Sequence, residues 1–188
     1  MTLTPQQEAA MRHYFKYLNR FMVIMWRLGL GRLLNAWPER GGQIMVIVHT
    51  GRKSGQTRYA PVNYALVDGE LYCSAGFGAK THWYKNIMAI PAVEVWLPDG
   101  RWTGVAEDVS DHADRLRLMR AVMIGSGFAA PLLANIHPHT MSDDALHELT
   151  ATYRLIHITR DHKRHTPGDL AWVLWGLLAL FLITRRKR

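Results

Sequence analysis

The feature that most constrains the fold of this chain is a series of short strand-like segments joined by tight turns. Alternating apolar and polar residues predict strands over 43–49, 59–67, 70–74, 93–97, 101–109 and 153–160. Asp68-Gly69 and Asp99-Gly100 each separate two of these segments, and both dipeptides are typical of two-residue hairpin turns. Six antiparallel strands with two adjacent hairpins fit a small barrel better than a parallel sheet. We therefore expect an α+β fold built around such a barrel.

Helices are expected at the start of the chain and between the last two strands. Thr4-Pro5-Gln6-Gln7 is a good helix start, and apolar residues recur from there to Leu28 at helical spacing, interspersed with Arg and Lys. This long basic amphipathic helix would pack on the barrel or dock on lipid. Asp111 and Ser142 are candidate N-caps of two later helices, which we expect to end near residues 125 and 150.

Composition limits the classes of function. The 188 residues suit one domain with appendages, and the formal charge of +8 comes from 23 basic and 15 acidic residues. Half of this charge lies in Arg185-Arg186-Lys187-Arg188, and the remaining basic residues show no interleaving with aromatic ones, so we expect no binding of nucleic acid. Cys73 is the only cysteine, which excludes an intramolecular disulfide and favours a reducing compartment.

The segment 49–58, His-Thr-Gly-Arg-Lys-Ser-Gly-Gln-Thr-Arg, reads as a turn between two strands that could bind an anion. Gly51 and Gly55 permit positive φ angles, so backbone N–H groups can converge on one point. The alternative is a solvated basic hairpin tip, because charge is common at such tips. The side chains that would bind phosphate or carboxylate are Arg52, Lys53, Ser54 and Arg58.

A second glycine-containing segment, 75–86, favours the anion-binding interpretation. Gly76 and Gly78 flank Phe77 just after a strand, and His82-Trp83-Tyr84 opens a helix that ends before Pro91. A helix N-terminus beside a glycine loop favours anions, and an indole supplies a flat face for a ring. Together the two segments indicate a phosphorylated heterocyclic cofactor, although Trp83 taken alone would more often be a core residue than a stacking partner.

Several separated motifs resemble the deazaflavin-dependent nitroreductase family. The resemblance covers roughly residues 30–160 and implies a split β-barrel related to flavin-binding (FMN-binding-like) barrels. It also implies an oxidoreductase with the reduced deazaflavin coenzyme F420 as hydride donor. The motifs are Thr50-Gly51-Arg52-Lys53-Ser54-Gly55-x-x-Arg58, Trp83-Tyr84-x-Asn86, Pro91-x-Val93-x-Val95 and Tyr153-Arg154-Leu155-Ile156-His157-Ile158.

The resemblance assigns three groups of residues to the cofactor. The first would bind its phosphate and acidic tail, the second would line the ring and linker, and the third would close the pocket. Ser74 is the candidate for orienting the ring or the acceptor, and His82 is a candidate proton donor. The groups are Arg52, Lys53, Ser54 and Arg58; Pro61, Asn63, Cys73, Ser74, Ala75 and Gly76; and His82, Trp83, Tyr84 and Asn86.

Two departures from the family pattern bear on the substrate. Members of the nitro-reducing branch often carry a Lys after the serine that matches Ser74, and this chain has Ala75 there. The tyrosine-rich segment that covers the substrate in that branch has no counterpart, since residues 119–141 contain no Tyr. Binding of the cofactor is therefore better supported than reduction of nitro compounds.

Other chemistries have weaker signals. His137-x-His139 and His162-x-x-His165 have possible ligand spacing, but no nearby cysteine or carboxylate pattern completes a site, so we expect no metal. Cys73 reads as a small buried residue on a strand rather than as a reactive thiol.

The C-terminal tail indicates membrane attachment. Residues 170–184 carry no charge, and a helix of this length reaches roughly 22 Å, short of the ~30 Å hydrocarbon core. Basic residues flank both ends, so shallow insertion competes with a full span. Packing of the helix in an oligomer is the alternative. We expect the protein at the cytoplasmic side of the cell membrane.

The sequence thus predicts three parts: an N-terminal amphipathic helix (1–37), a split β-barrel that binds deazaflavin (38–161), and a membrane-associating helix with a basic tail (162–188). The predicted activity is hydride transfer from reduced F420 to a hydrophobic small-molecule acceptor such as a quinone or nitro compound. The alternatives are an oxidoreductase that uses flavin mononucleotide (FMN) and a non-catalytic carrier of cofactor or lipid. A homodimer is also considered, because barrels of this type often dimerise.

Overall fold

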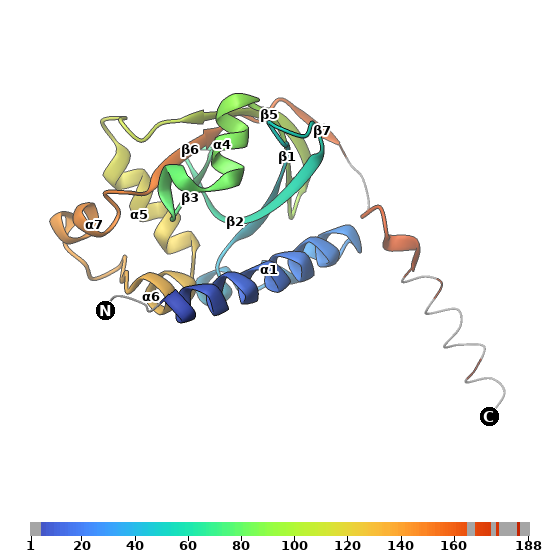
Figure 1. The fold of residues 1–188 in the computed structure, drawn as a ribbon, viewed down its shortest axis with the longest axis horizontal. Helices are drawn as coiled ribbons and strands as arrows, with labels where there is room; N and C mark the ends of the chain where they lie inside the picture. Colours follow the sequence, from blue (N-terminus) through green and yellow to red (C-terminus); the bar gives the residue numbers. More distant parts are fainter. Residues whose placement is uncertain (1–4, 165–167, 174–175, 177–183, 185–188) are drawn as a thin grey trace.

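The computed structural model describes residues 5–164, 168–173, 176 and 184, with residues 5–15 and 39 described by their backbone alone. Six strands form a closed antiparallel barrel (Figure 1). Neighbours follow the order β4-β1-β2-β3-β6-β5, and pairing of β4 with β5 closes the circle. The strands are β1 Ile44–Thr50, β2 Thr57–Val67, β3 Glu70–Ala75, β4 Ala92–Leu97, β5 Gly100–Asp108 and β6 Arg154–Ile158. The expected barrel and α+β class are confirmed.

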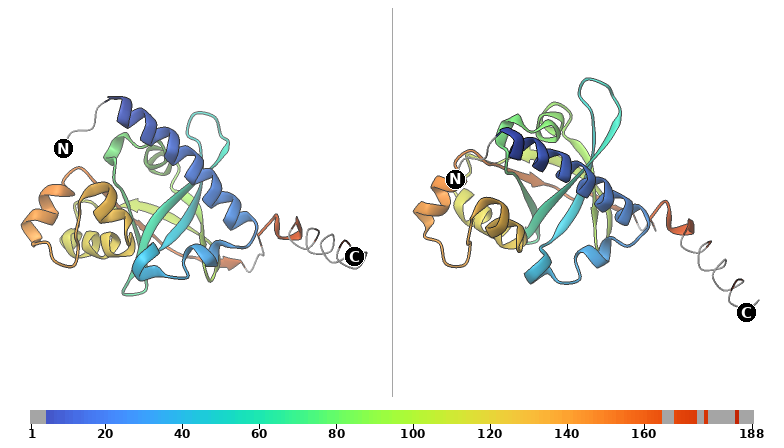
Figure 2. Two further views of the ribbon diagram at one scale, coloured as in Figure 1. Left: turned by 90° about the horizontal axis from the view of Figure 1, so that it is seen from below. Right: turned by 60° about the horizontal axis from the view of Figure 1, so that its bottom comes forward.

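Helices surround the barrel on three sides. The long helix α1 crosses one face of it, α4 lies over one end, and α5, α6 and α7 gather at one side (Figures 1 and 2). The helices are α1 Pro5–Arg27, α2 Gly31–Leu34, α3 Pro38–Gly41, α4 His82–Ala89, α5 Arg115–Gly125, α6 Ala129–Ala134 and α7 Asp143–Leu149, with a 3-10 turn η1 at Gly78–Lys80.

Strand alternation divides the apolar residues between two main cores. Met45, Ile47 and Cys73 point into the barrel and are fully buried there. Residues of the opposite parity, such as Ala65 and Leu155, point outward and pack against α5 and α7. A third, smaller cluster joins α1 to the outer face of β1 and β4 through Trp26, Val46 and Trp96.

The first predicted hairpin has the expected geometry. Asp68 and Gly69 have φ angles of 55° and 85°, the two left-handed residues of a type I′ turn. In the second hairpin the two-residue loop is Pro98-Asp99 rather than the predicted Asp99-Gly100, because Leu97 pairs with Gly100, which has a φ of 150°. The Asp99 carboxylate accepts hydrogen bonds from Trp102 Nε1 at 3.2 Å and Lys163 Nζ at 3.0 Å, so side chains hold this second turn.

Of two predicted helix caps, one is confirmed and one is wrong. The Ser142 hydroxyl accepts a hydrogen bond from the Ala145 N–H at 3.3 Å and caps α7 as predicted. The prediction for Asp111 is wrong, because α5 begins only at Arg115. The chain before it forms turns, in which His112 N–H donates to the Val109 carbonyl. The predicted cap Thr4 lies outside the described residues.

The sequence did not predict α2, α3, α6 or the three-residue strand β7 His162–Arg164. Tertiary contacts define these short elements: β7 pairs with Arg101–Thr103 of β5, and Phe128 N–H at the start of α6 donates to the Arg40 carbonyl of α3. An element of three to six residues has too few positions for a periodic pattern.

The start of the C-terminal tail is docked on the end of α1. Leu170 N–H donates to the Arg27 carbonyl at 2.8 Å, and Asp169 forms an ion pair with the Arg27 guanidinium at 2.7 Å. Most of the apolar stretch 170–184, on which the membrane prediction rests, lies outside the described residues. Within the described part, no helix combines the length and apolarity needed to cross a bilayer.

Cys73 offers a test of the barrel core. Its side chain is fully buried, and burial strongly raises the pKa of its thiol, so the reactive thiolate is suppressed. We expect no reaction of the native protein with a thiol reagent at pH 8 over minutes, and full reaction in denaturant. Replacing it by Ser should lower the free energy of unfolding by about 1–3 kcal/mol because a hydroxyl enters an apolar core. Rapid native labelling would contradict this packing.

Candidate functional site

The two glycine-containing segments come together at one end of the barrel. The first forms the turn between β1 and β2, which projects from the body of the protein (Figure 2). The second leads from the end of β3 through η1 into α4, and α4 lies against β1 and β5. Residues that the sequence separates by about thirty positions are therefore neighbours.

A buried asparagine on α4 joins these two segments. Asn86 is only 8% exposed, and its Oδ1 accepts hydrogen bonds from Arg52 Nη1 at 2.8 Å and Arg52 N at 3.3 Å. Its Nδ2 lies 3.4 Å from His49 Nδ1. Both polar atoms of Asn86 thus have protein partners, and its amide oxygen holds Arg52 in place.

His49 completes this chain of contacts, and the sequence analysis did not assign it a role. The side chain is 5% exposed. Burial and, to a smaller extent, the charge of Arg58 lower the pKa of His49, against a hydrogen bond to the Thr50 backbone that raises it. Arg52 donates to Asn86 Oδ1, so the Nδ2 of Asn86 is turned toward His49. A neutral imidazole can accept the hydrogen bond from this Nδ2.

We expected backbone N–H groups of the β1–β2 turn to converge on one point. This prediction is wrong. Gly51 N–H donates to the Gln56 carbonyl, and those of Ser54 and Gly55 both donate to the Gly51 carbonyl. Gln56 N–H lies 3.4 Å from the Ser54 hydroxyl. Four of the turn's amides are thus engaged within the turn, which closes in a helical-type bend with Gly55 at a φ of 65°. The turn therefore offers an anion mainly its side chains.

The side chains of this turn form a cluster of positive charge. Lys53, Ser54 and Arg58 are exposed, and Arg58 Nη2 donates to Gln56 Oε1 at 3.0 Å. In the part of the chain that the structure describes, no carboxylate forms an ion pair with Arg52, Lys53 or Arg58. We call these three residues the cation turn. Three uncompensated cations on one turn suit a ligand with several negative charges.

The predicted ring-lining residues divide between two faces of the sheet. Cys73 and Ala75 are 0% and 2% exposed and point into the barrel core, so their side chains cannot line an open site. The pairing of Tyr64 with Cys73 places Asn63 beside Ser74 on the outer face, and Pro61 shares that face. The outer face of β2 and β3 thus starts at the cation turn and carries the half-buried residues Pro61, Asn63 and Ser74.

The loop after β3 is shaped by glycine and carries an exposed ring. Gly78 has a φ of 62°, and a Cβ there would lie 2.4 Å from the Thr152 carbonyl oxygen, so only glycine fits. Gly76 lies against the ring of Tyr153, at 3.6 Å from the position of a Cβ. Phe77 between them is 75% exposed, which the sequence analysis did not use as a site feature.

The three predicted site residues in the first turn of α4 differ in their surroundings. His82 is exposed, whereas Trp83 and Tyr84 pack against the barrel core, as the alternative for Trp83 stated. The Tyr84 hydroxyl donates to Asp108 Oδ2 on β5. Burial, followed by this hydrogen bond, raises the pKa of Tyr84 to about 12. Tyr84 therefore anchors α4 to the barrel.

Asp108 is a further charged residue at this end that sequence reasoning missed. Burial raises the pKa of this carboxyl, but hydrogen bonds from Ser110 and Tyr84, together with the charge of Arg154, outweigh it and hold the pKa below its usual range. Arg154 Nη1 lies 4.0 Å from Asp108 Oδ2. The anchor is thus a carboxylate in its charged form.

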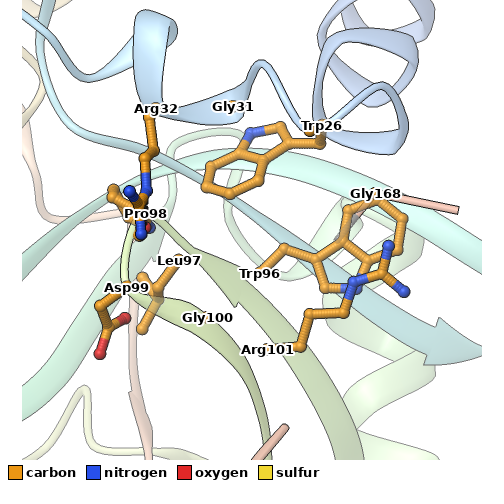
Figure 3. A pocket seen from close by; sticks show the side chains of 11 residues that line it. Trp26, Gly31, Arg32, Trp96, Leu97, Pro98, Asp99, Gly100, Arg101 and Gly168 are labelled. Carbon is orange, nitrogen blue, oxygen red and sulfur yellow. Dashed lines mark hydrogen bonds between the residues drawn. The ribbon is translucent and has the colours of Figure 1, made fainter. Parts of the chain in front are cut away.

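Cavities border the cation turn and the opposite end of the barrel. One of about 430 Å³ borders the base of the cation turn, with His49, Thr50 and Thr57 in its wall together with residues of β4 and β5. It does not include Ser74 or the start of α4. The other, of about 410 Å³, lies between α2 and the β4–β5 hairpin (Figure 3). Among the described residues, no group of three His, Cys, Asp or Glu side chains could hold a metal ion.

Comparison with known proteins assigns the family. Residues 18–126 match the model of the F420H(2)-dependent quinone reductase family. The chain belongs to this family. It is accordingly an F420-dependent oxidoreductase that acts on a small-molecule acceptor, and coenzyme F420 is its cofactor. No curated protein matches the chain.

Solved structures show more distant likenesses. A conserved hypothetical protein from Mycobacterium tuberculosis has a TM-score of 0.49 and 19% identity, over 65% of this chain and 75% of that one. A structure described as an F420-H2 dependent reductase has a TM-score of 0.44 and 22% identity, over 62% and 92%. A third, described as an F420 reductase, has a TM-score of 0.44 and 21% identity, over 70% and 96%.

Tyr84→Phe tests the anchor of α4 by its dependence on pH. Asp108 has a lowered pKa in the folded state, so its contribution to stability is present above its unfolded pKa and is lost as the pH falls through the folded one. We expect the variant to lose about 1–2 kcal/mol of unfolding free energy at pH 7, since a charge-assisted hydrogen bond disappears. The loss should shrink below about pH 4, where the carboxyl of the parent protein protonates.

Urea unfolding at several pH values measures this difference. Tyr59→Phe, which removes a hydroxyl from a half-exposed ring on β2, is the matched control and should show no such dependence. A Tyr84→Phe loss that is equal at pH 7 and pH 3 would refute the ionised anchor.

Proposed function

We propose that this protein binds F420 with its acidic tail on the cation turn and its ring along the outer face of β2 and β3. The observation that carries this proposal is the absence, among the described residues, of any carboxylate paired with Arg52, Lys53 or Arg58. The phosphate and acidic tail of F420 would supply the missing negative charge. The outer face that carries Pro61, Asn63 and Ser74 begins where the turn ends.

The proposed acceptor is a hydrophobic carbonyl compound, a quinone first and a nitro compound second. Reduced F420 supplies the hydride, and conversion of a quinone into a quinol needs one hydride and one proton in all. Ser74 would orient the ring or the acceptor through its hydroxyl on β3. Exposed His82, on the first turn of α4, is the candidate for delivering the proton near neutral pH. The family to which the chain belongs supports the quinone.

The proposal includes attachment to the cytoplasmic side of the membrane through the C-terminal tail. A quinone with a long apolar chain resides in the bilayer, so a reductase gains access to it by residing at the surface. The uncharged stretch 170–184 and the four basic residues that follow supply apolar area and attraction to anionic lipid. The docking of Asp169 and Leu170 on Arg27 places the start of this stretch beside the end of α1.

A homodimer is a secondary part of the proposal. Three apolar side chains on and before α6 are largely exposed, with fractions of 60% for Phe128, 71% for Leu132 and 51% for Leu133. A second copy would remove them from water. Sedimentation of the tail-deleted protein in detergent-free buffer distinguishes a dimer from a monomer.

Replacing Lys53 and Arg58 together by Ala tests the cofactor site. Each charge-assisted contact with the tail contributes about a factor of ten to affinity, so the double variant should bind F420 about 100-fold more weakly. Titration followed by intrinsic Trp fluorescence measures this change. Arg117→Ala, which removes another exposed cation, paired with Asp68 at the far end of β2, should leave the affinity for F420 unchanged. An equal loss of F420 affinity in both variants would show a nonspecific effect of charge and contradict the proposed site.

Deleting the chain after Asp169 tests membrane attachment. The full chain should float with vesicles that contain phosphatidylglycerol, and the truncated chain should remain in solution and retain F420 binding, because the site lies on the barrel. Flotation of both forms to the same extent would contradict attachment through the tail.

A further inference from the structure

The cavity of about 410 Å³ at the opposite end of the barrel is not explained by F420 binding. It lies between the end of α1, helix α2 and the β4–β5 hairpin (Figure 3). The pairs Val46–Trp96 and Val48–Glu94 show that this hairpin lies beyond the Ile44 end of β1, whereas the cation turn follows Thr50. Seven residues of strand separate the two ends by roughly 20 Å.

Two indole rings form apolar walls of this cavity. Trp26 is 8% exposed and lies directly against Gly31, where a Cβ would come within 2.2 Å of the ring. Trp96, on β4, is 3% exposed. Glycine at position 31 thus lets α2 approach the ring closely. The cavity volume falls in the range of small-molecule sites, about 300–1,000 Å³.

Two arginines reach the same cavity from opposite sides (Figure 3). Arg32 of α2 donates from Nε to the Pro98 carbonyl at 2.7 Å, which fixes its guanidinium at the cavity edge. Among the described residues, no carboxylate pairs with Arg32, and its two Nη atoms have no protein acceptor. Arg101 of β5 lies over the Trp96 ring, with its Cζ 4.3 Å from the ring centre.

The local charge balance is positive. Arg101 reaches Asp169 only at 3.5 Å, and Asp169 already pairs with Arg27 at 2.7 Å. Asp99 in the cavity wall pairs with Lys163 at 3.0 Å. The cavity wall thus holds two guanidinium groups, those of Arg32 and Arg101, and one carboxylate, that of Asp99, and Arg32 has no carboxylate partner among the described residues.

We propose that this cavity binds an anionic group carried on an apolar body. The phosphate or carboxylate would contact Arg32 and Arg101, and the apolar part would lie against the Trp26 and Trp96 rings. Gly168 also lines the cavity, so the site lies where the apolar tail leaves the barrel. An anionic phospholipid and a soluble amphipathic anion share this chemistry, and the site is independent of F420.

Octyl phosphate, used below the concentration at which it forms micelles, is a suitable probe for the full chain in calorimetry. We expect it to bind, and octyl glucoside, which carries the same chain without charge, to bind at least tenfold more weakly. Arg32→Gln and Arg101→Gln should each weaken the binding of octyl phosphate about tenfold. Arg117→Gln should leave the affinity for octyl phosphate unchanged. Equal affinities for the parent and both cavity variants would overturn the proposal.

Two further measurements separate this site from the cofactor site and from misfolding. Lys53→Ala/Arg58→Ala should retain octyl phosphate binding, and Arg32→Gln should retain F420 binding; loss in the first case would place the probe on the cation turn and overturn the inference. Arg32 is exposed, so its variant should keep the parent's melting temperature. Weaker binding of Arg32→Gln to phosphatidylglycerol vesicles supports a lipid as the natural ligand, and unchanged vesicle binding with lost octyl phosphate binding supports a soluble anion.

Discussion

The arrangement of the candidate site depends on one buried amide. Asn86 accepts hydrogen bonds from the backbone and the guanidinium of Arg52 and approaches His49 with its Nδ2. Through these contacts α4 is tied to the turn between β1 and β2. Burial makes the contacts strong, because an unpaired amide at 8% exposure would cost about 1–3 kcal/mol. The charges of the cation turn are therefore presented by a rigid support, which lowers the entropic cost of binding a polyanion.

Much of the fold could be predicted because its information is local. The barrel strands alternate with period two, and Asp68-Gly69 supplies both left-handed residues of a hairpin turn. The short elements α2, α3, α6 and β7 could not be predicted, since partners distant in the chain define them. Asp111 failed as a cap for a local reason: the chain before α5 forms turns, in which His112 N–H donates to the Val109 carbonyl, and the helix begins only at Arg115.

The site shows the same division between local and distant information. The cations of 52–58 and the aromatic start of α4 were visible as motifs, and the structure gathers them at one end of the barrel. The use of turn amides was mispredicted because the glycines satisfy the turn's own hydrogen bonds. His49 and Asp108 were missed because their partners Asn86 and Tyr84 lie 37 and 24 positions away. A histidine directly before a glycine turn was the one available signal for the first.

The central claim is that the cation turn recognises the charged tail of F420. The most direct test compares, by fluorescence titration at two salt concentrations, the affinity of the protein for whole F420 and for its deazaflavin core without phosphate and acidic tail. The account predicts that whole F420 binds about 100-fold more tightly at low salt and that added salt narrows this difference. Equal affinities for the two compounds at both salt concentrations would contradict it.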